Sequence, residues 1–272
     1  MTDTPIFAEL KSRALVSVSG DDWRTFLQGL VTQDVETLAA GELRHAALLS
    51  PQGRLLFDLL ILGRNDGCWL DVAADRREAL IPRLLMYRLR ARVEIAPLEQ
   101  PVSALFPAPR DGVGAPGFVP DPRLPALGLR GYGAAPPAGV VIAEEAAWEA
   151  HRLALGVPEA ADFGEDKTFP IEANFDLTHG IDFKKGCFVG QETTSRMKRR
   201  GQIKSRMLPI AFDGPPPAFG AEVLAGELRA GQVLSGGPGR SMALLRLDRI
   251  EGATLTVDGR PVTVERPDWL AA

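Results

Sequence analysis

The sequence is poor in residues that commonly bind metals. It has 272 residues but only two cysteines, Cys68 and Cys187, and three histidines, His45, His151 and His179. Two cysteines cannot supply the four thiolates that usually hold an iron–sulfur cluster. The histidines lack the spacing of a zinc site. We therefore predict no metal site built by this chain alone.

Long apolar runs and a signal-peptide pattern are also lacking. No stretch reaches the roughly 18 apolar residues of a membrane span, and residues 1–5 lack the basic and apolar regions of a signal peptide. We therefore expect a cytoplasmic protein without membrane contact, whose thiols stay reduced. The net charge of −4 argues against direct binding of tRNA.

The first hundred residues alternate between strand and helix patterns. Trp23, Phe26, Leu27 and Leu30 have helical spacing, which predicts one buried face. We predict a second helix over 75–90, with Leu80, Leu84, Leu85 and Leu89 inward and Pro82 as a kink or as its start. Strands are predicted at 14–19, 45–50, 54–62, 68–73 and 91–96, so the pattern is α+β.

The remainder of the chain changes character twice. Residues 107–139 are rich in Pro and Gly, which predicts a long loop between subdomains. A short strand is predicted at 139–143, and helices are predicted at 144–155 and 190–200. Six short strands separated by turns follow Gly201, which favours a small barrel. We place the domain boundary there, giving regions 1–200 and 201–272.

One segment is typical of a reactive cysteine. Two lysines, Lys184 and Lys185, precede Cys187, and a predicted helix begins at Gly190. Positive charge and a helix N-terminus both favour thiolate, while Gly186 and Gly190 permit tight turns. The competing interpretation is a buried, inert thiol, which is the common state of a lone cysteine. Cys68, in an apolar strand, fits that description.

This segment resembles the signature of the YgfZ family, in which the usual form is Lys-Gly-Cys-Tyr-x-Gly-Gln-Glu. Further ordered similarities cover most of the chain. They comprise Phe26-Leu27-Gln28-Gly29-x-x-Thr32-Gln33-Asp34, Tyr87-x-Leu89-Arg90-Ala91-x-Val93, Asp121-Pro122-Arg123-x-x-x-Leu127-Gly128-x-Arg130, Phe169-Pro170-x-Glu172-x-Asn174 and Gly180-Ile181-x-Phe183.

The family is related to the glycine-cleavage T-protein, a tetrahydrofolate-dependent aminomethyltransferase. The resemblance implies an α+β fold of two interleaved ferredoxin-like subdomains, the second over about residues 46–100, and a C-terminal β-barrel. It implies a folate-dependent accessory factor, without classical turnover, for assembly or repair of iron–sulfur proteins, including tRNA-modifying enzymes. The expected partners are folate and iron–sulfur client or assembly proteins, and we expect a monomer.

The resemblance also assigns roles to individual residues. Cys187 would act on sulfur, iron or a partner, Lys185 and Gly186 would support its thiolate, and Gln191 and Glu192 would fix the loop. Tetrahydrofolate would contact five residues, namely Asp58, Trp148, Glu172, Asn174 and Arg196. Trp148 could equally be a core residue, and the basic run from Arg196 to Arg206 could be a solvated helix end.

Two departures from the relatives bear on the chemistry. A T-protein segment with two adjacent acidic residues keeps only one here, Asp58, because Phe57 replaces its neighbour. Ala154 stands where relatives carry a glutamate that pairs with the pterin ring, a task suited to a carboxylate. Two alternatives stay open: a tetrahydrofolate-dependent one-carbon transferase in which Asp58 orients an amine, and a binding module that docks through 196–206.

Overall fold

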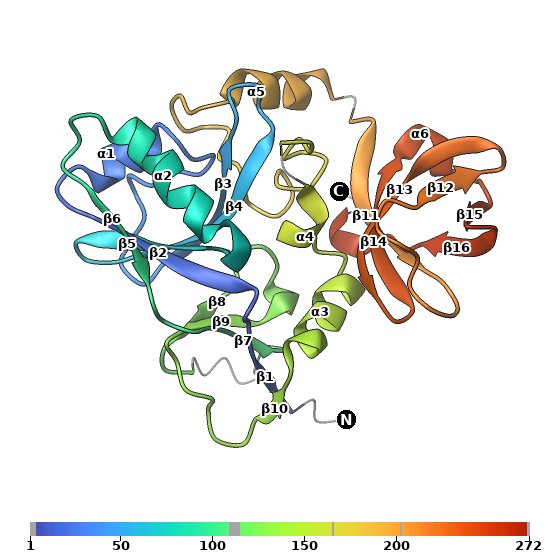
Figure 1. Ribbon diagram of the computed structural model, residues 1–272, viewed down its shortest axis with the longest axis horizontal. Coiled ribbons are helices and arrows are strands. Elements are labelled where there is room, and N and C mark those ends of the chain that lie inside the picture. Colours follow the sequence, from blue (N-terminus) through green and yellow to red (C-terminus); the bar gives the residue numbers. More distant parts are fainter. Residues whose placement is uncertain (1–3, 109–114, 165, 202, 271–272) are drawn as a thin grey trace.

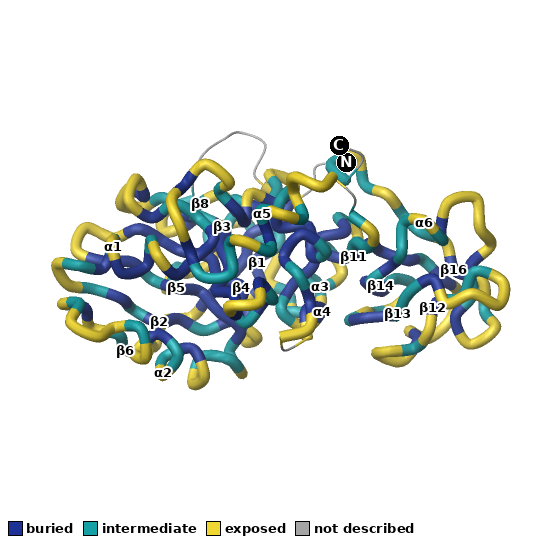
Figure 2. The backbone as a smooth tube through the Cα atoms, turned by 90° about the horizontal axis from the view of Figure 1, so that it is seen from above, coloured by how far each residue is buried: buried dark blue, intermediate teal, exposed yellow. Residues whose placement is uncertain are grey.

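The computed structural model describes residues 4–108, 115–164, 166–201 and 203–270. Two five-stranded sheets lie side by side, and a closed barrel follows at the other end of the molecule (Figure 1). Figure 2 shows buried backbone running through both parts, with exposed turns at the periphery. No helix in these ranges is long and apolar enough to cross a membrane.

The central sheet is antiparallel and has the order β3-β4-β5-β2-β6. The strands are β2 (Arg13–Ser19), β3 (Leu43–Leu49), β4 (Leu55–Gly63), β5 (Gly67–Ala73) and β6 (Glu94–Leu98). The helices α1 (Trp23–Gln28) and α2 (Arg77–Arg88) pack on it, and α2 follows the short 3-10 helix η1 (Ala74–Arg76). The predicted inner residues Trp23, Phe26, Leu27 and Leu30 are all buried.

The prediction for α2 was partly wrong. Leu80 and Leu84 are buried, but Leu85 is 39% exposed and Leu89 is 89% exposed. Leu85 is rotated about 100° from Leu84 around the helix axis, and Leu89 lies beyond the helix end with a φ of 42°. Pro82 lies inside the helix and does not start it.

The second sheet has the order β10-β1-β7-β9-β8 and consists of short strands. Its elements are β1 (Ile6–Glu9), β7 (Val102–Phe106), β8 (Phe118–Pro120), the 3-10 helix η2 (Pro125–Leu127), β9 (Leu129–Tyr132) and β10 (Val141–Ala143). The patterns predicted only β10. The stretch 107–139 contains β8 and β9 and is therefore not simply a loop, although 109–114 lie outside the described residues. Because β1 precedes the central sheet in the chain and β7 follows it, the two sheets are interleaved.

The C-terminal barrel matches the six predicted strands and closes on itself. Its strands are β11 (Ser205–Ala211), β12 (Glu222–Ala225), β13 (Leu228–Gly237), β14 (Arg240–Arg246), β15 (Leu255–Val257) and β16 (Arg260–Val264). The remaining helices are α3 (Glu145–Ala154), α4 (Ala160–Phe163), α5 (Gln191–Arg200), α6 (Leu247–Ile250) and η3 (Asp268–Leu270). Leu153 and Phe163 share a core with Met207 and Met242, which attaches the barrel to α3 and α4.

Candidate functional site

The two cysteines lie in opposite environments. Cys187 is exposed on the loop before α5, whereas Cys68 is buried in β5. Burial raises the pKa of the Cys68 thiol well above its usual range, so this thiol stays protonated. Of the two, only Cys187 has a sulfur that another molecule can reach.

The side chain of Lys185 is buried beneath the loop rather than beside the thiol. Its Nζ donates hydrogen bonds to the carbonyl oxygens of Gln28 at 2.8 Å, Val31 at 2.7 Å and Gln33 at 2.8 Å. Burial lowers its pKa to about 8. All three ammonium donors are used, so Lys185 anchors the cysteine loop to the segment after α1 and does not hold the thiolate as we expected.

The two glycines beside Cys187 differ in their surroundings. Gly190 has a φ of 79°, and a Cβ there would lie 2.6 Å from the Ser50 carbonyl oxygen and 2.9 Å from the Cα of Gly53. Gly190 therefore allows the loop to approach the β3–β4 turn. Gly186 faces open space, with no atom within 4 Å of such a Cβ. Our expectation of a tight turn applies to Gly190 and not to Gly186.

The start of α5 completes the loop. The Gln191 side chain donates to the Gly186 carbonyl oxygen at 3.4 Å, and the Val189 amide donates to the Gly29 carbonyl oxygen at 3.2 Å. Glu192 is exposed in the first turn of α5, and its carboxylate has no partner among the described residues. Gln191 thus lies where it can fix the loop, while Glu192 does not.

The basic run splits into an exposed part and a paired part. Arg196, Arg199 and Arg200 are exposed on α5. Arg206 instead points inward, where its guanidinium binds Asp176 at 2.9 Å and the Asn174 side chain at 3.0 Å. The α5 portion of this run and exposed Lys204 can therefore form a basic surface, whereas Arg206 cannot.

A separate cleft of about 910 Å³ opens beside α3 and α4. It is lined by apolar Leu55 and Phe57 and by charged Arg13, Asp58, Glu149 and Glu159. Arg13 is buried and binds Asp58 at 2.8 Å and Asp71 at 2.6 Å. None of residues 183–192 lines this cleft. The exposed thiol and the cleft are therefore two distinct places on the molecule.

Only one of the five expected folate contacts lies in the cleft, and it is Asp58. Trp148 is 1% exposed and packs on the Phe106 ring, with a centroid distance of 5.5 Å. Glu172 accepts from the Phe169 amide at 3.0 Å, and Asn174 donates to the Met207 carbonyl oxygen at 2.8 Å. These three side chains hold the fold together, and Arg196 lies on α5 outside the cleft.

The alanine at position 154, where relatives carry a glutamate, does not affect the cleft in this structure. Ala154 is exposed at the end of α3 and does not line the cleft, whereas Glu149 does. The Glu149 carboxylate contacts Arg152 at 2.6 Å, and desolvation by burial raises its pKa. Helical geometry explains why sequence reasoning missed Glu149, since only one face of α3 borders the cleft.

A buried ion-pair network supports the cleft from behind, and it too was missed. Asp121 binds Arg123 at 2.8 Å and Arg130 at 3.1 Å, and both arginines bind Glu159. The arginines lower the pKa of Glu159 to about 2 despite its burial. The motif from Asp121 to Arg130 therefore has a structural role. Its signal in the sequence was a set of charges in a segment otherwise rich in Pro and Leu.

The fold is that of an aminomethyltransferase T-protein. The crystal structure of glycine cleavage system aminomethyltransferase T from Bartonella henselae superposes with a TM-score of 0.78, covering 98% of this chain and 86% of that one, at 18% identity. A family model described as the CAF17 C-terminal beta-barrel domain matches residues 204–272. Together with the closed barrel, this confirms the predicted fold class.

Curated relatives identify the family more closely. The human iron–sulfur cluster assembly factor IBA57, mitochondrial, is 31% identical over 96% of this chain and 84% of its own length. The IBA57 homolog of Mycosarcoma maydis is 33% identical over 78% of this chain, which spans 59% of that longer protein. The chain belongs to the family of the iron–sulfur cluster assembly factor IBA57.

The comparisons overturn one expectation. We expected a cytoplasmic address from the residues at the start of the chain, but the relatives from human, Mycosarcoma maydis and Neurospora crassa are named as mitochondrial proteins. The residues at positions 1–5 therefore do not identify the compartment.

Proposed function

We propose that this chain is an accessory factor for the assembly or repair of iron–sulfur proteins and that Cys187 supplies one thiolate to iron shared with a partner. The observation that carries the proposal is an exposed sulfur on a loop fixed by Lys185 and Gly190. Clusters need about four ligands, usually thiolates, and no group of three metal-binding side chains occurs within the described ranges. The missing ligands must then come from another protein.

Replacement of Cys187 by Ser tests this role. The variant should unfold at the same urea concentration as the wild type, because the thiol is exposed. It should lose activity in an assay that follows the return of activity to an apo iron–sulfur enzyme. Cys68→Ser is not a suitable control because Cys68 is buried. An exposed change on the barrel such as Glu227→Gln, which should retain activity, serves instead. Full activity in Cys187→Ser would remove the cysteine mechanism.

We further propose that the cleft beside α3 binds a folate, as in YgfZ proteins. The T-protein-like fold and the cleft's lining support this: apolar walls suit a flat pterin, and Glu149 and Asp58 are acceptors for its N–H groups. Folate would carry one-carbon units if bound. The residues here would orient it and exclude water. Titration with tetrahydrofolate, comparing wild type with Glu149→Gln and with exposed Glu192→Gln, should show weakening in the first variant alone.

The one-carbon transferase is the second candidate, because Asp58 lines the cleft. In the structure this carboxylate already binds Arg13 at 2.8 Å, so an incoming amine would have to share it. This alternative predicts folate-dependent turnover of a small aminomethyl donor that is lost in Asp58→Asn. A purified protein that binds folate but shows no turnover would favour the accessory role. Clients among tRNA-modifying enzymes remain part of the proposal for that role.

The binding-module alternative depends on α5 and on exposed Lys204, because Arg206 is paired internally. It predicts that Arg196→Glu with Arg199→Glu abolishes activity while Cys187→Ser does not. The thiol mechanism predicts the reverse order of effects.

A further inference from the structure

The end of α2 exposes apolar side chains that the fold does not use. Met86 is 68% exposed, Leu89 is 89% exposed and Leu85 is 39% exposed. Of the three, Leu89 lines a hollow of about 410 Å³ together with Phe26, Leu30 and Tyr87. Leu85 and Met86 precede it by one helical turn, in the last residues of α2. Single exposed leucines are common on protein surfaces, but a contiguous apolar patch beside a hollow is typical of an interaction site.

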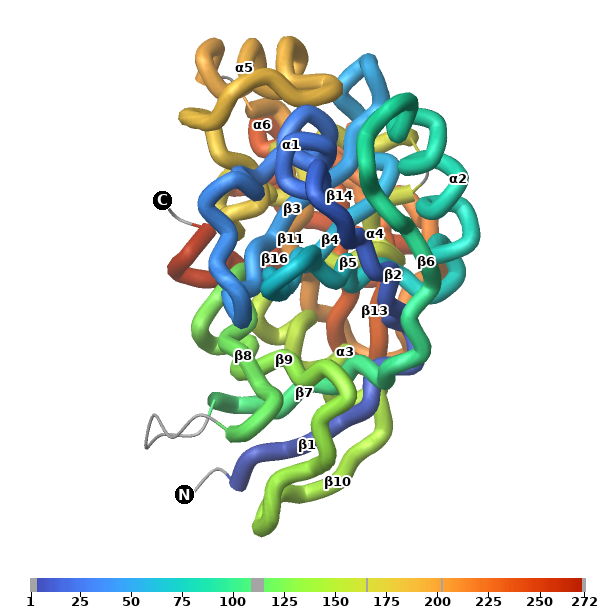
Figure 3. Tube along the Cα trace, turned by 90° about the vertical axis from the view of Figure 1, so that its left-hand side faces the viewer, coloured from blue at the N-terminus to red at the C-terminus, as the bar shows by residue number. Residues whose placement is uncertain are grey.

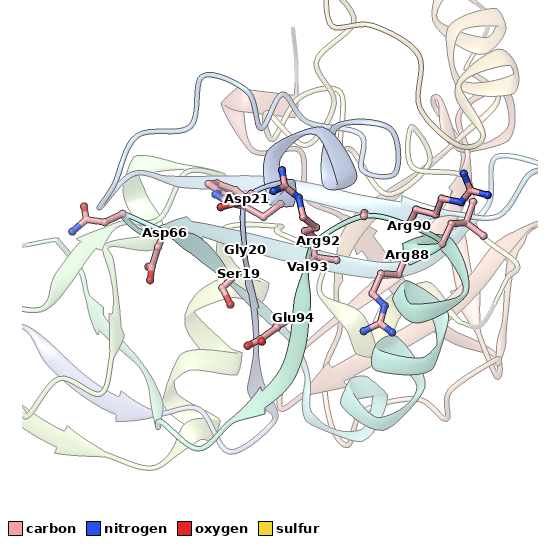
Figure 4. Close-up of a pocket in the computed structure, with 13 residues that line it drawn as sticks. Ser19, Gly20, Asp21, Asp66, Arg88, Arg90, Arg92, Val93 and Glu94 are labelled. Atoms are coloured by element: carbon pink, nitrogen blue, oxygen red, sulfur yellow. Dashed lines mark ion pairs between the residues drawn. The ribbon is translucent and has the colours of Figure 1, made fainter.

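Arginines surround this patch, and two of them are unpaired. Arg92 binds Asp21 at 2.8 Å and Asp22 at 3.2 Å. Within the ranges that the structure describes, Arg88 and Arg90 have no carboxylate partner. Both line a second hollow of about 870 Å³, where Figure 4 shows their side chains spreading from the end of α2, away from Asp21. Two uncompensated positive charges therefore lie at the edge of the apolar patch.

The patch is continuous with the anchor of the cysteine loop. Phe26 and Leu30 line the hollow, and Gly29, between them, accepts a hydrogen bond from the Val189 amide. Val31, the next residue, accepts from Lys185. Figure 3 shows α1 between α2 and the segment that leads into α5. One rigid element, α1 with its following turn, thus connects the patch to the loop that carries Cys187.

We propose that the patch formed by Met86, Leu89, Arg88 and Arg90 is the docking surface for the protein that provides the remaining iron ligands. The proposal rests on the function proposed above. The partner that fits has an apolar side chain for the hollow and a surrounding rim of Asp or Glu for the two arginines. Met suits such a site because its flexible thioether adapts to the surface it meets. A partner docked there would contact α1 and its following turn, to which the loop that carries Cys187 is hydrogen-bonded.

The test titrates this protein into a nuclease-treated extract from cells that lack it, and measures the rate at which an added apo iron–sulfur enzyme regains activity. Met86→Glu with Leu89→Glu should raise the half-maximal concentration by about tenfold or more and leave the plateau rate unchanged. Arg88→Glu with Arg90→Glu should raise it by about tenfold and remove its dependence on salt. Cys187→Ser should lower the plateau instead.

Leu228→Glu is the matched control, because Leu228 is 64% exposed on the barrel. It should change neither the half-maximal concentration nor the plateau rate. Half-maximal concentrations equal to wild type in both patch variants would overturn the docking surface while leaving the proposed function intact. A lowered plateau at unchanged half-maximal concentration would also overturn it. If the wild type does not restore activity to the apo iron–sulfur enzyme, both the proposed function and the docking surface are rejected. If the patch variants differ from wild type only after RNA is added back to the extract, the patch binds RNA and the protein partner is rejected. If the wild type is a dimer that Met86→Glu dissociates, the patch binds a second copy of this chain and the protein partner is likewise rejected.

Discussion

The cysteine loop and the cleft beside α3 and α4 stabilise buried charge in different ways. In the cleft, Arg13 is neutralised by Asp58 and Asp71, and Glu159 by two arginines. In the loop, the single buried cation, Lys185, meets three backbone carbonyl oxygens and no carboxylate. The cleft therefore depends on charge balance between distant segments, whereas the loop depends on the path of the backbone after α1. Damage to the cleft should act on the whole fold, and damage to the loop should act on the site.

The largest effect should come from Arg13→Met. It leaves Asp58 and Asp71 buried without their common partner, and loss of one member of a buried pair costs about 3–5 kcal/mol. Urea unfolding followed by circular dichroism measures this. Arg246→Met, which removes an exposed pair with Asp248, should change the midpoint little. Equal midpoints for the two variants would show that the cleft does not need charge balance.

Lys185→Met should rank next. It leaves three carbonyl oxygens without their donor, for an expected loss of about 3 kcal/mol. Its exposed neighbour offers the control Lys184→Met, which should be neutral. Amide hydrogen exchange should become faster only in residues 183–190, which include the Val189 amide. If exchange instead rose throughout the central sheet, the distinction between a local and a global anchor would fail.

Gly190→Ala should cost about 2 kcal/mol, because a Cβ would meet the Ser50 carbonyl oxygen at 2.6 Å and the residue has a φ of 79°. Gly186 lies four positions before Gly190 and has open space around it, so Gly186→Ala should shift stability by less than about 0.5 kcal/mol. The difference between the urea-unfolding midpoints of the two variants measures how tightly the loop is held against the β3–β4 turn. Similar midpoints would contradict the close approach at Gly190.

The smallest effect concerns pH and the buried residue His45. Burial lowers the pKa of His45 to about 4 in the folded chain, against about 6.5 when unfolded. Between these values the unfolded chain binds a proton that the folded chain does not. Protonation therefore favours unfolding as the pH falls below 6.5.

The loss attributable to His45 should reach about 2 kcal/mol at pH 5. Unfolding free energies at pH 7 and pH 5 for wild type and His45→Gln measure it. His151 also has a lowered pKa, and its contribution cancels in the difference between the two proteins. A His45→Gln variant with the wild-type pH dependence would show that another group carries it.

Sequence patterns were reliable where a single face had to be buried. The spacing of Trp23 to Leu30 placed α1, and the turn-separated strands after Gly201 placed the barrel. The strands β1, β7, β8 and β9 are only three to five residues long, which leaves little periodicity, and they escaped prediction. Barrel strands of similar length were recognised by the turns that separate them. The same reasoning failed at Leu89, where the helix ends before the pattern does.

The site divides along similar lines. Local chemistry predicted an exposed Cys187 on a glycine-containing loop, since a thiol, neighbouring lysines and a helix start are adjacent in the chain, and the structure confirms the exposure. The positions of Trp148, Glu172 and Asn174 depend on distant segments, so the expectation that they contact folate could not be judged from their types. Glu149 and Arg13 were missed because cleft residues come from five separate segments.

The order of residues alone determined the helical faces, the barrel strands and the presence of one cysteine in a glycine-flanked segment. Tertiary structure alone decided that Lys185 binds carbonyl oxygens, that Trp148 is sealed in the core and that the thiol lies apart from the cleft. The physical reason is range: periodicity and turn preferences act over a few residues. A buried charge, by contrast, takes whichever partner the fold brings within about 3 Å, however far away along the chain.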